Sequence, residues 1–230
     1  MRSCLVIAGE YRTFDQTYES IAEFAKINDL DVYCHLWTDN ELEVESVKDK
    51  LNPKFITVDS PALYKDSFLD IEKRIKENNP KGPNGDKVWQ NASMNFSRKK
   101  AFESVPKYTY TTLVFARYDL KIVTPFNFSQ VPAGVVTAFA ESWGLISDVF
   151  AIMPFDQAQH FFLYDEFERL HSTPFEEEFI DYLRNDFKYG ENNRRIHRDE
   201  RYCPHMILIR NFVLNKIPWG TADFPVRLQR

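Results

Sequence analysis

The sequence predicts an α/β fold: a mixed, mostly parallel central sheet flanked by helices, with a helical C-terminal part. Three observations predict it. Short apolar runs alternate with helix-like segments through residue 119, two closely spaced strand-like runs follow, and the remainder is mostly helix-like. Alternating strands and helices favour a Rossmann-like parallel sheet with right-handed crossovers, and two strands joined by a short link favour an antiparallel addition. Because the chain shows no internal repeat and no break in composition, we expect a single domain over residues 1–230.

Four buried strands are expected in the first part of the chain, each a short apolar or β-branched run that ends at a turn residue or a charge. The first, "SCLVIAG", ends at Gly9, and the fourth, "YTTLVFARYD", ends in Arg117 and Asp119. The strands are expected at residues 3–9, 31–37, 54–60 and 110–119. Helices are expected between them at residues 15–28, 41–51, 61–79 and 88–105. Residues 78–87, which are rich in Pro, Gly and Asn, predict a loop.

The second part of the chain departs from this alternation. Two strands joined by a short link are expected at residues 134–141 and 147–153. Helices are expected at residues 155–170, 174–187 and 204–215, and a charged, irregular segment at 188–203 separates the last two.

Composition and charge exclude several classes of function. The 230 residues are 43% hydrophobic, and their net charge of −5 counts against a nucleic-acid binder, which normally presents a net basic face. Three cysteines without a C-x-x-C spacing predict neither a zinc site nor a disulfide framework, and they indicate a reducing compartment. No stretch is long enough for a transmembrane segment, and the apolar run at residues 4–9 is too short for a signal peptide. We therefore expect a soluble, cytoplasmic protein, in the host cytoplasm if the source is viral.

Candidate functional residues lie where the predicted parallel strands end, because ligands of open α/β sheets bind beyond the carboxyl ends of the strands. These positions are residues 9–13, 37–39 and 117–119. The first loop lacks G-x-G-x-x-G, and the chain has no P-loop, no G-x-S-x-G and no H-E-x-x-H. What remains is arginine, suited to phosphate, with carboxylates suited to a ribose, a base or a divalent metal. The pattern favours a phosphate-bearing nucleotide as ligand.

Several segments follow one another in an order typical of one enzyme family. They are "LVIAGEYRTFDQTYESIAEF" with "DLDVYCHLWTD", then "WQNASMNFSRKKAFE", "YTTLVFARYDLKI", "SDVFAIMP" and "CPHMILIRNFVLNKI". Together they resemble nucleotide-sugar-dependent glycosyltransferases of the GT-A type, including the small enzymes of bacterial and large-virus surface-glycan clusters. The resemblance covers most of residues 3–217. It implies a GT-A-like domain with a nucleotide-binding half (1–119) and an acceptor half (120–230). It also implies sugar transfer from a nucleotide diphosphate sugar, with a UDP-sugar as the expected donor, to a hydroxyl of a glycan acceptor.

The resemblance also implies roles for individual residues. Asp119 falls on the second carboxylate of the D-x-D motif, which holds Mn²⁺ or Mg²⁺ on the donor's diphosphate, and His205 would complete the metal shell. Arg117 stands in place of the first carboxylate, where it would itself neutralise diphosphate charge. Asp148 would activate the acceptor. The other expected contacts with the nucleotide sugar are Gly9, Tyr11, Arg12, Thr13, Asp39, Gln90 and Arg98. The literal D-x-D at residues 29–31 precedes its strand, so it lies at the wrong edge of the sheet for a metal site.

Each assigned residue also has a purely structural interpretation. The alternatives are an ion pair of Asp119 with Arg117 or Lys121, an ion pair of Arg12 with Asp15, a helix cap at Asp39, a strand-start turn at Asp148, a structural histidine at His205, and core positions for Trp37 and Trp89. Two other functions stay open. One is a non-catalytic nucleotide-sugar or glycan-binding module, which Arg117 favours, and the other is a different Rossmann-like transferase, which the glycine-poor first loop disfavours.

Overall fold

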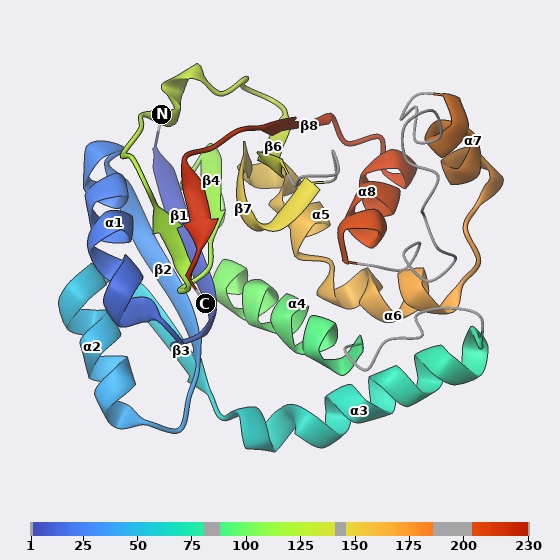
Figure 1. The fold of residues 1–230 in the computed structure, drawn as a ribbon, viewed down its shortest axis with the longest axis horizontal. Helices are drawn as coiled ribbons and strands as arrows, with labels where there is room; N and C mark the ends of the chain where they lie inside the picture. The colour runs from blue at the N-terminus through green and yellow to red at the C-terminus, as the bar shows by residue number, and fades with distance from the viewer. Residues whose placement is uncertain (1, 81–87, 141–145, 186–203, 230) are drawn as a thin grey trace.

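The structure is a computed structural model that describes residues 2–80, 88–140, 146–185 and 204–229 (Figure 1). Its strands are β1 (Ser3–Glu10), β2 (Leu30–Trp37), β3 (Phe55–Asp59), β4 (Thr112–Ala116), β5 (Leu120–Ile122), β6 (Val136–Ala140), β7 (Ile146–Pro154), β8 (Trp219–Ala222) and β9 (Val226–Leu228). Its helices are α1 (Phe14–Ile27), α2 (Glu41–Leu51), α3 (Pro61–Asn78), α4 (Val88–Glu103), α5 (Ala158–Phe162), α6 (Tyr164–Ser172), α7 (Glu177–Asn185) and α8 (Pro204–Leu214). Short 3₁₀ turns lie at Phe128–Gln130 and Phe155–Gln157.

The central sheet has seven strands in the order β3-β2-β1-β4-β7-β6-β8. Strands β1 to β4 are parallel to one another, β7 runs antiparallel to both β4 and β6, and β8 is parallel to β6. Strands β5 and β9 form a separate antiparallel pair. The predicted α/β class, with a mixed and mostly parallel sheet flanked by helices, is therefore confirmed, and so is the antiparallel addition after β4.

Apolar side chains alternate across the sheet and build one core on each face. From β1, Cys4, Val6 and Ala8 join the core that includes side chains of α4, α5 and α8, while Leu5 and Ile7 join the core on the α1 and α2 side. This alternation follows from the period of two in a strand whose two faces are both covered. In Figure 1, α1 and α2 lie on one side of the sheet, and α4, α5 and α8 lie on the other. A third, smaller cluster joins Trp37 to α3, α4 and α6.

Several expected boundaries were wrong. The helix predicted at 155–170 is two helices, α5 and α6, separated by Leu163, whose φ of +52° lies in the left-handed region. The strand predicted at 110–119 is shorter, because β4 ends at Ala116 and a tight turn at residues 117–119 leads into β5. Strands β5, β8 and β9 were not predicted at all. The predicted segment 188–203 and most of the predicted loop at 78–87 lie outside the described residues.

The parallel strands set the position of the candidate site. Strands β1, β2 and β4 are in register, so that Ile7 pairs with both Cys34 and Ala116, and their carboxyl ends meet at one edge of the sheet. Helix α4 packs across β1 and β2 on one face and reaches the same edge. Within the described part of the chain, no helix is both long and apolar enough to cross a membrane.

Candidate functional site

A cleft opens at this edge, where β1, β2 and β4 end beside α4, and its volume is about 230 Å³. Such edges bind ligands in open α/β sheets. The residues that line it are Ala8, Gly9, Glu10, Arg12, Trp37, Trp89, Gln90, Asn91, Ser93, Met94, Arg117, Tyr118 and Asp119. The strand ends supply guanidinium and carboxylate groups, whereas α4 supplies aromatic, thioether and amide groups.

Arg117 and Asp119 form a two-armed ion pair just beyond the end of β4. Nε of Arg117 donates to Oδ1 of Asp119 over 2.9 Å, and Nη2 donates to Oδ2 over 2.6 Å. Asp119 is only 5% exposed, and Arg117 is half-buried. A guanidinium that contacts both carboxylate oxygens fixes the plane of each group. Of the two ion-pair partners considered for Asp119, Arg117 is therefore the one in contact.

Arg12 reaches the same carboxylate from beyond the end of β1. Its Nη1 donates to Oδ2 of Asp119 over 3.3 Å, and its Nε donates to Oε2 of Glu10 over 2.9 Å. Burial alone would lower the pKa of Arg12, but the two carboxylates outweigh it and raise that pKa. The alternative pairing with Asp15 is not the one formed, since Asp15 instead contacts Lys50.

The loop between β1 and α1 carries the backbone strain that places Arg12. Gly9 has a φ of +135°, and Arg12 itself has a φ of +40°. No atom lies within 4 Å of a Cβ added to Gly9, so the backbone conformation, and not space, requires glycine there. A non-glycine residue in the left-handed region costs about 1–2 kcal/mol, and strain of this kind concentrates at binding sites.

The turn that carries Asp119 is tied to distant parts of the chain. Thr17 of α1 donates its hydroxyl hydrogen to the backbone oxygen of Tyr118, and the backbone N–H of Gln229 donates to the backbone oxygen of Asp119 over 2.8 Å. These bonds fix the turn between β4 and β5, so the Arg117–Asp119 pair stands on a rigid support.

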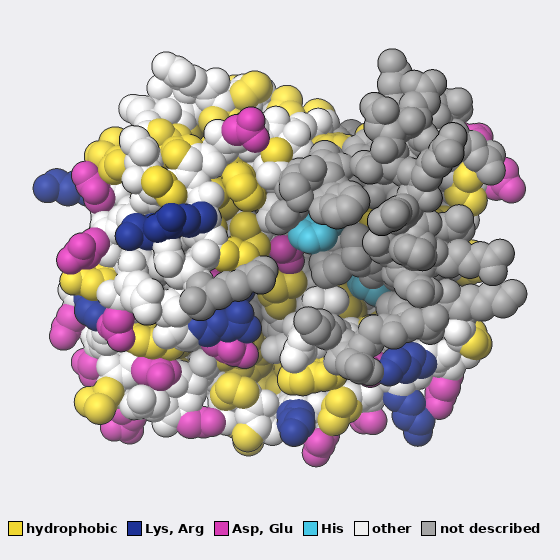
Figure 2. All heavy atoms as spheres, viewed as in Figure 1, with side chains coloured by type: hydrophobic (Ala, Val, Ile, Leu, Met, Phe, Trp, Pro, Cys, Tyr) yellow, Lys and Arg dark blue, Asp and Glu magenta, His cyan; other side chains and the backbone are white. Residues whose placement is uncertain are grey.

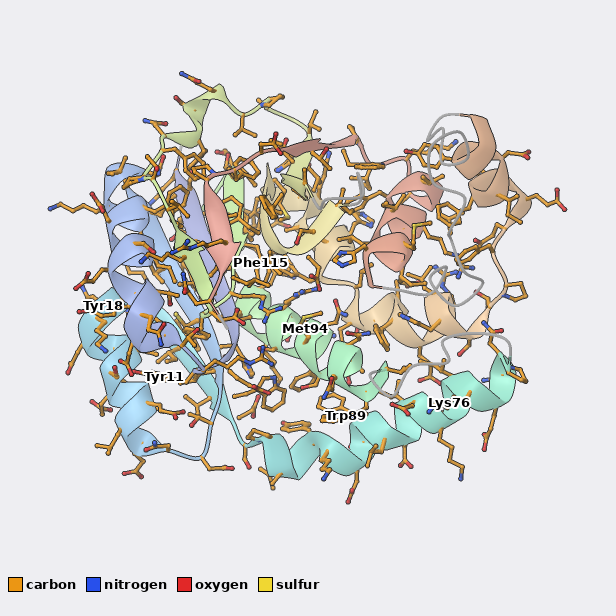
Figure 3. All side chains as sticks on the ribbon, in the orientation of Figure 1. Tyr11, Tyr18, Lys76, Trp89, Met94 and Phe115 are labelled. Carbon is orange, nitrogen blue, oxygen red and sulfur yellow. The ribbon has the colours of Figure 1, made fainter. Side chains whose placement is uncertain are left out.

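Helix α4 forms the opposite wall of the cleft. Trp89, Gln90 and Met94 line it from successive turns, and Trp89 and Met94 are labelled along α4 in Figure 3. The backbone N–H of Trp89 is fixed by Glu72 of α3 over 2.9 Å. Trp37 also lines the cleft, but it is 5% exposed and stacks on Phe96, so it belongs to the core as well.

Arg98 and Asp148 form a buried ion pair between α4 and β7. Nη2 of Arg98 donates to Oδ2 of Asp148 over 2.8 Å and to its backbone oxygen over 2.6 Å. The two residues are 2% and 7% exposed. Burial would raise the pKa of Asp148, but the charge of Arg98, with His205 and Arg117 adding to it, lowers that pKa to about 2. Asp148 is thus a weak base held by Arg98, and neither residue lines the cleft.

His205 lies in the first turn of α8. Its Nδ1 is 2.8 Å from the backbone oxygen of Ile146, so in the neutral ring this nitrogen carries the proton and donates. The positive charge it can carry is close enough to Asp148 to influence that carboxylate. The structure therefore places His205 beside Asp148 and not among the residues that line the cleft.

Besides Arg98, three further expected nucleotide contacts lie outside the lining of the cleft. The hydroxyl of Tyr11 bonds to Asp15 and to Ser46 of α2, and its label in Figure 3 lies on the α1 and α2 side. Thr13 precedes α1 and donates to the backbone oxygen of Gln229, without capping the helix through its side chain. Asp39 is exposed and is not the cap of α2, because Asn40 accepts the N–H of Leu42. None of the three expected residues is among those that line the cleft.

Five of the residues predicted from the sequence line the cleft, and other lining residues were not predicted. Gly9, Arg12, Gln90, Arg117 and Asp119 line it, as expected from their places at strand ends and on α4. The residues missed are Ala8, Asn91, Ser93 and Met94. Glu10 and Tyr118 lay within the candidate ranges but had no assigned role, and Trp37 and Trp89 were favoured as core positions. The helical spacing of Gln90 and Met94 was the available signal for the wall, but spacing does not reveal what a helix face contacts.

The described residues do not fit a divalent cation held by protein ligands alone. Both oxygens of Asp119 already accept bonds from guanidinium groups. Within the described ranges, no group of three or more His, Cys, Asp or Glu residues could hold a metal ion. Three of the roughly four lone-pair sites of Asp119 accept from guanidinium groups, so a cation at the remaining site would lie beside the charges of both arginines.

Charges of both signs are mixed over the surface around the site. Figure 2 shows dark blue and magenta side chains interspersed on the described part of this face. That distribution agrees with the net charge of −5, and the described residues visible in this view form no continuous basic surface of the kind that nucleic-acid binding uses.

No protein-family model matches the chain, and no curated protein matches it. Among solved structures, mouse xyloside xylosyltransferase 1 in its apo form is similar with a TM-score of 0.46 and 12% identity, over 96% of this chain and 85% of that one. The glycosyltransferase GlyE of Streptococcus pneumoniae TIGR4 is similar with a TM-score of 0.42 and 10% identity, over 96% of this chain and 45% of that one. The apo form of GlyE gives a TM-score of 0.42 and 11% identity, over 96% and 44%. This chain therefore spans less than half of GlyE. Similarities this distant carry no argument about what the chain does.

Proposed function

We propose that the protein is a glycosyltransferase that moves a sugar from a nucleotide diphosphate sugar to a hydroxyl of a glycan acceptor. The observation that carries the proposal is the cleft itself. At the carboxyl edge of the parallel strands, Arg12 and Arg117 share a lining with Trp89 and Met94 of α4. One wall suits phosphate oxygens, and the other suits the flat faces of a base or a sugar.

Many proteins bind nucleotides at such an edge, and the order of segments along the chain is the reason that we propose glycosyl transfer in particular. The strand-end arginines, α4, the turn after β4 and the strand that carries Asp148 occur in the order found in GT-A-type enzymes. A UDP-sugar donor, a glycan acceptor and a cytoplasmic location are predictions from the sequence that accompany this proposal.

The chemistry of sugar transfer determines which groups the cleft must provide. The bond between the anomeric carbon and the phosphate oxygen breaks, and its electron pair stays on the departing diphosphate. The acceptor oxygen forms the new bond to that carbon, and its proton is released to solvent. Negative charge therefore grows on the diphosphate, and fixed positive groups stabilise that change most when they are already oriented. Arg117, held by two hydrogen bonds to Asp119, is such a group.

Asp148 takes a different part in this proposal from the one expected of it. Its pKa of about 2 makes it a poor acceptor of a proton at neutral pH, and both of its contacts with Arg98 would have to loosen first. We assign it the positioning of Arg98, which joins α4 to β7 behind the cleft.

The same cleft also suits a binding module that does no chemistry, because both oxygens of Asp119 accept hydrogen bonds from arginine. A turnover experiment separates the two. The protein is incubated with a panel of nucleotide diphosphate sugars and a glycan acceptor mixture, with and without Mn²⁺, and released nucleoside diphosphate and extended glycan are measured by mass spectrometry. Release from at least one donor that depends on the acceptor supports the enzyme. Binding of a donor without release under every condition would assign the binding module instead.

A further inference from the structure

We propose that Arg12 and Arg117 form a seat for the donor's diphosphate that works without a divalent cation, with Asp119 positioning the two guanidinium groups. This inference rests on the proposed function, because it specifies how that same cleft takes its ligand. It differs from the expectation drawn from the sequence, in which Asp119 is a ligand of Mn²⁺ or Mg²⁺.

The contacts of Asp119 are those of an orienting group. Its Oδ1 accepts from Nε of Arg117, and its Oδ2 accepts from Nη2 of Arg117 and from Nη1 of Arg12, at 2.9, 2.6 and 3.3 Å. With a side chain that is 7% exposed, this carboxylate has little access to solvent. A metal ion at the remaining lone pair of Oδ1 would lie against the guanidinium group of Arg117, whereas an anion can bind to the arginines and leave all three bonds in place.

Each arginine keeps donors that the described residues do not use. Arg117 bonds to Asp119 through Nε and Nη2, which leaves Nη1 with no acceptor in the described part of the chain. Arg12 bonds through Nε and Nη1, so its Nη2 likewise has no acceptor among the described residues. Guanidinium groups carry five N–H donors, so each terminal nitrogen that is left offers two to phosphate oxygens. Both residues line the cleft, so these donors serve one ligand.

The balance of charge at this edge also favours an anion. Three guanidinium groups, those of Arg12, Arg98 and Arg117, face two buried carboxylates, Asp119 and Asp148. The other carboxylate that lines the cleft, Glu10, has a side chain that is 56% exposed, so water screens it. After burial, the charge of Arg117 helps to lower the pKa of Arg98, so these two cations are close enough to repel. A bound diphosphate relieves that repulsion, and a divalent cation adds to it.

Calorimetric titration of UDP and of inorganic pyrophosphate, in EDTA and in Mn²⁺, tests the proposal. The wild-type protein is expected to bind both ligands in EDTA, with affinities within about threefold of those in Mn²⁺. Arg12→Met and Arg117→Met are each expected to weaken binding at least tenfold in EDTA. Arg2→Met is the matched control, because Arg2 lies at the amino end of β1, pairs with Asp31 and makes the same change of charge at the opposite edge of the sheet.

Asp119→Asn gives the sharpest contrast between the two ways of holding the diphosphate. Asn keeps an acceptor oxygen for the arginines and removes a negative charge beside the diphosphate, so UDP binding in EDTA is expected to hold or to tighten. If Asp119 were instead a metal ligand, UDP binding by the wild type would depend on Mn²⁺, and Asp119→Asn would weaken that binding. If Arg117→Met does not fold, as judged by circular dichroism, Arg12→Met and Arg117→Lys carry the test.

The outcomes separate this inference from the proposed function. Binding of UDP that disappears in EDTA, or arginine variants that bind as tightly as the wild type, would overturn the cation-free seat, even if sugar transfer is observed. Binding in EDTA that depends on both arginines, with no release from any nucleotide sugar, would keep the seat and overturn the glycosyltransferase. A protein that binds neither UDP nor pyrophosphate under any condition contradicts the seat directly.

Discussion

Arg117 holds both carboxylate oxygens of Asp119, a residue only two positions further along the chain, with hydrogen bonds of 2.9 and 2.6 Å. The pair lies in the turn that follows β4, and Arg12 joins it from the loop that follows β1. Two loops far apart in the sequence thus meet through one buried carboxylate, and this relationship underlies both proposals.

Replacing Asp119 with Asn is expected to destabilise the protein while preserving the cleft. The amide keeps the shape of the side chain but leaves Arg117 without its charged partner, while Arg12 keeps Glu10, and an unsatisfied buried partner costs about 1–3 kcal/mol. Urea denaturation measures the free energy of unfolding. Glu10→Gln is the control, since Glu10 contacts Arg12 from an exposed position and its loss is expected to cost under about 1 kcal/mol. Equal stability of Asp119→Asn and the wild type would show that the pair is not a structural anchor.

The buried pair of Arg98 and Asp148 is expected to behave as a unit. Asp148→Ala leaves the guanidinium of Arg98 buried and uncompensated, which costs about 3–5 kcal/mol. The double variant Arg98→Met, Asp148→Leu removes both charges and fills the space with apolar atoms, so it is expected to recover most of that loss. Chemical denaturation of Arg98→Met, Asp148→Leu and the double variant measures the coupling. If the losses simply add, the pair is not a unit and Asp148 is free for another role.

His171 is expected to make the protein less stable in mild acid. It is 1% exposed, and burial, followed by the charge of Arg210, lowers its pKa from 6.5 to about 4. Below about pH 6.5 the unfolded chain takes up a proton that the folded protein does not, so stability falls as the pH drops from 6.5 to 4. The full effect is about 3 kcal/mol.

His171→Gln removes this titration and keeps a polar side chain near the backbone oxygen of Phe167, which accepts from Nδ1 of the histidine. The difference in unfolding free energy between wild type and variant is expected to shrink between pH 7 and pH 4, measured by denaturant titration at each pH. A difference that stays constant over this range would contradict a neutral, buried His171. Because His35 also has a lowered pKa, the wild type alone does not isolate the effect.

Trp89 is expected to contribute to binding of the nucleoside and not of the phosphates. Stacking of a base on an aromatic side chain is worth about 1–3 kcal/mol, so Trp89→Ala should weaken UDP binding roughly five- to 150-fold. Pyrophosphate has no base, so its affinity should not change. Trp89→Phe should retain most of the UDP affinity. Equal losses for UDP and pyrophosphate would show that the variant disturbs the cleft as a whole.

The main elements of the fold follow from local sequence patterns, and what was missed depends on long-range pairing. Buried parallel strands such as β1 are continuous apolar runs that stop at Gly or a charge, so they were predicted to within a residue or two. Strands β5, β8 and β9 are three or four residues long and exist through partners over 80 residues away, which no local pattern encodes. The break at Leu163 has no Gly or Pro to announce it.

The sequence predicted the location of the candidate site better than it predicted which side chains meet there. The rule that ligands bind beyond the carboxyl ends of parallel strands brought Gly9, Arg12 and Arg117 to one cleft. Tyr11 lies in the same loop as Arg12, yet its hydroxyl reaches Ser46 of α2. Which way a loop side chain points depends on individual backbone angles, such as the positive φ of Arg12, and these follow from the folded structure.

The most direct test of the central claim is a crystal structure of the protein with UDP bound, grown in EDTA. The account predicts the diphosphate in the cleft, with its oxygens within hydrogen-bonding distance of the guanidinium groups of both Arg12 and Arg117 and with the Arg117–Asp119 pair intact. A nucleotide bound outside this cleft, or a diphosphate in the cleft that contacts neither arginine, would contradict it.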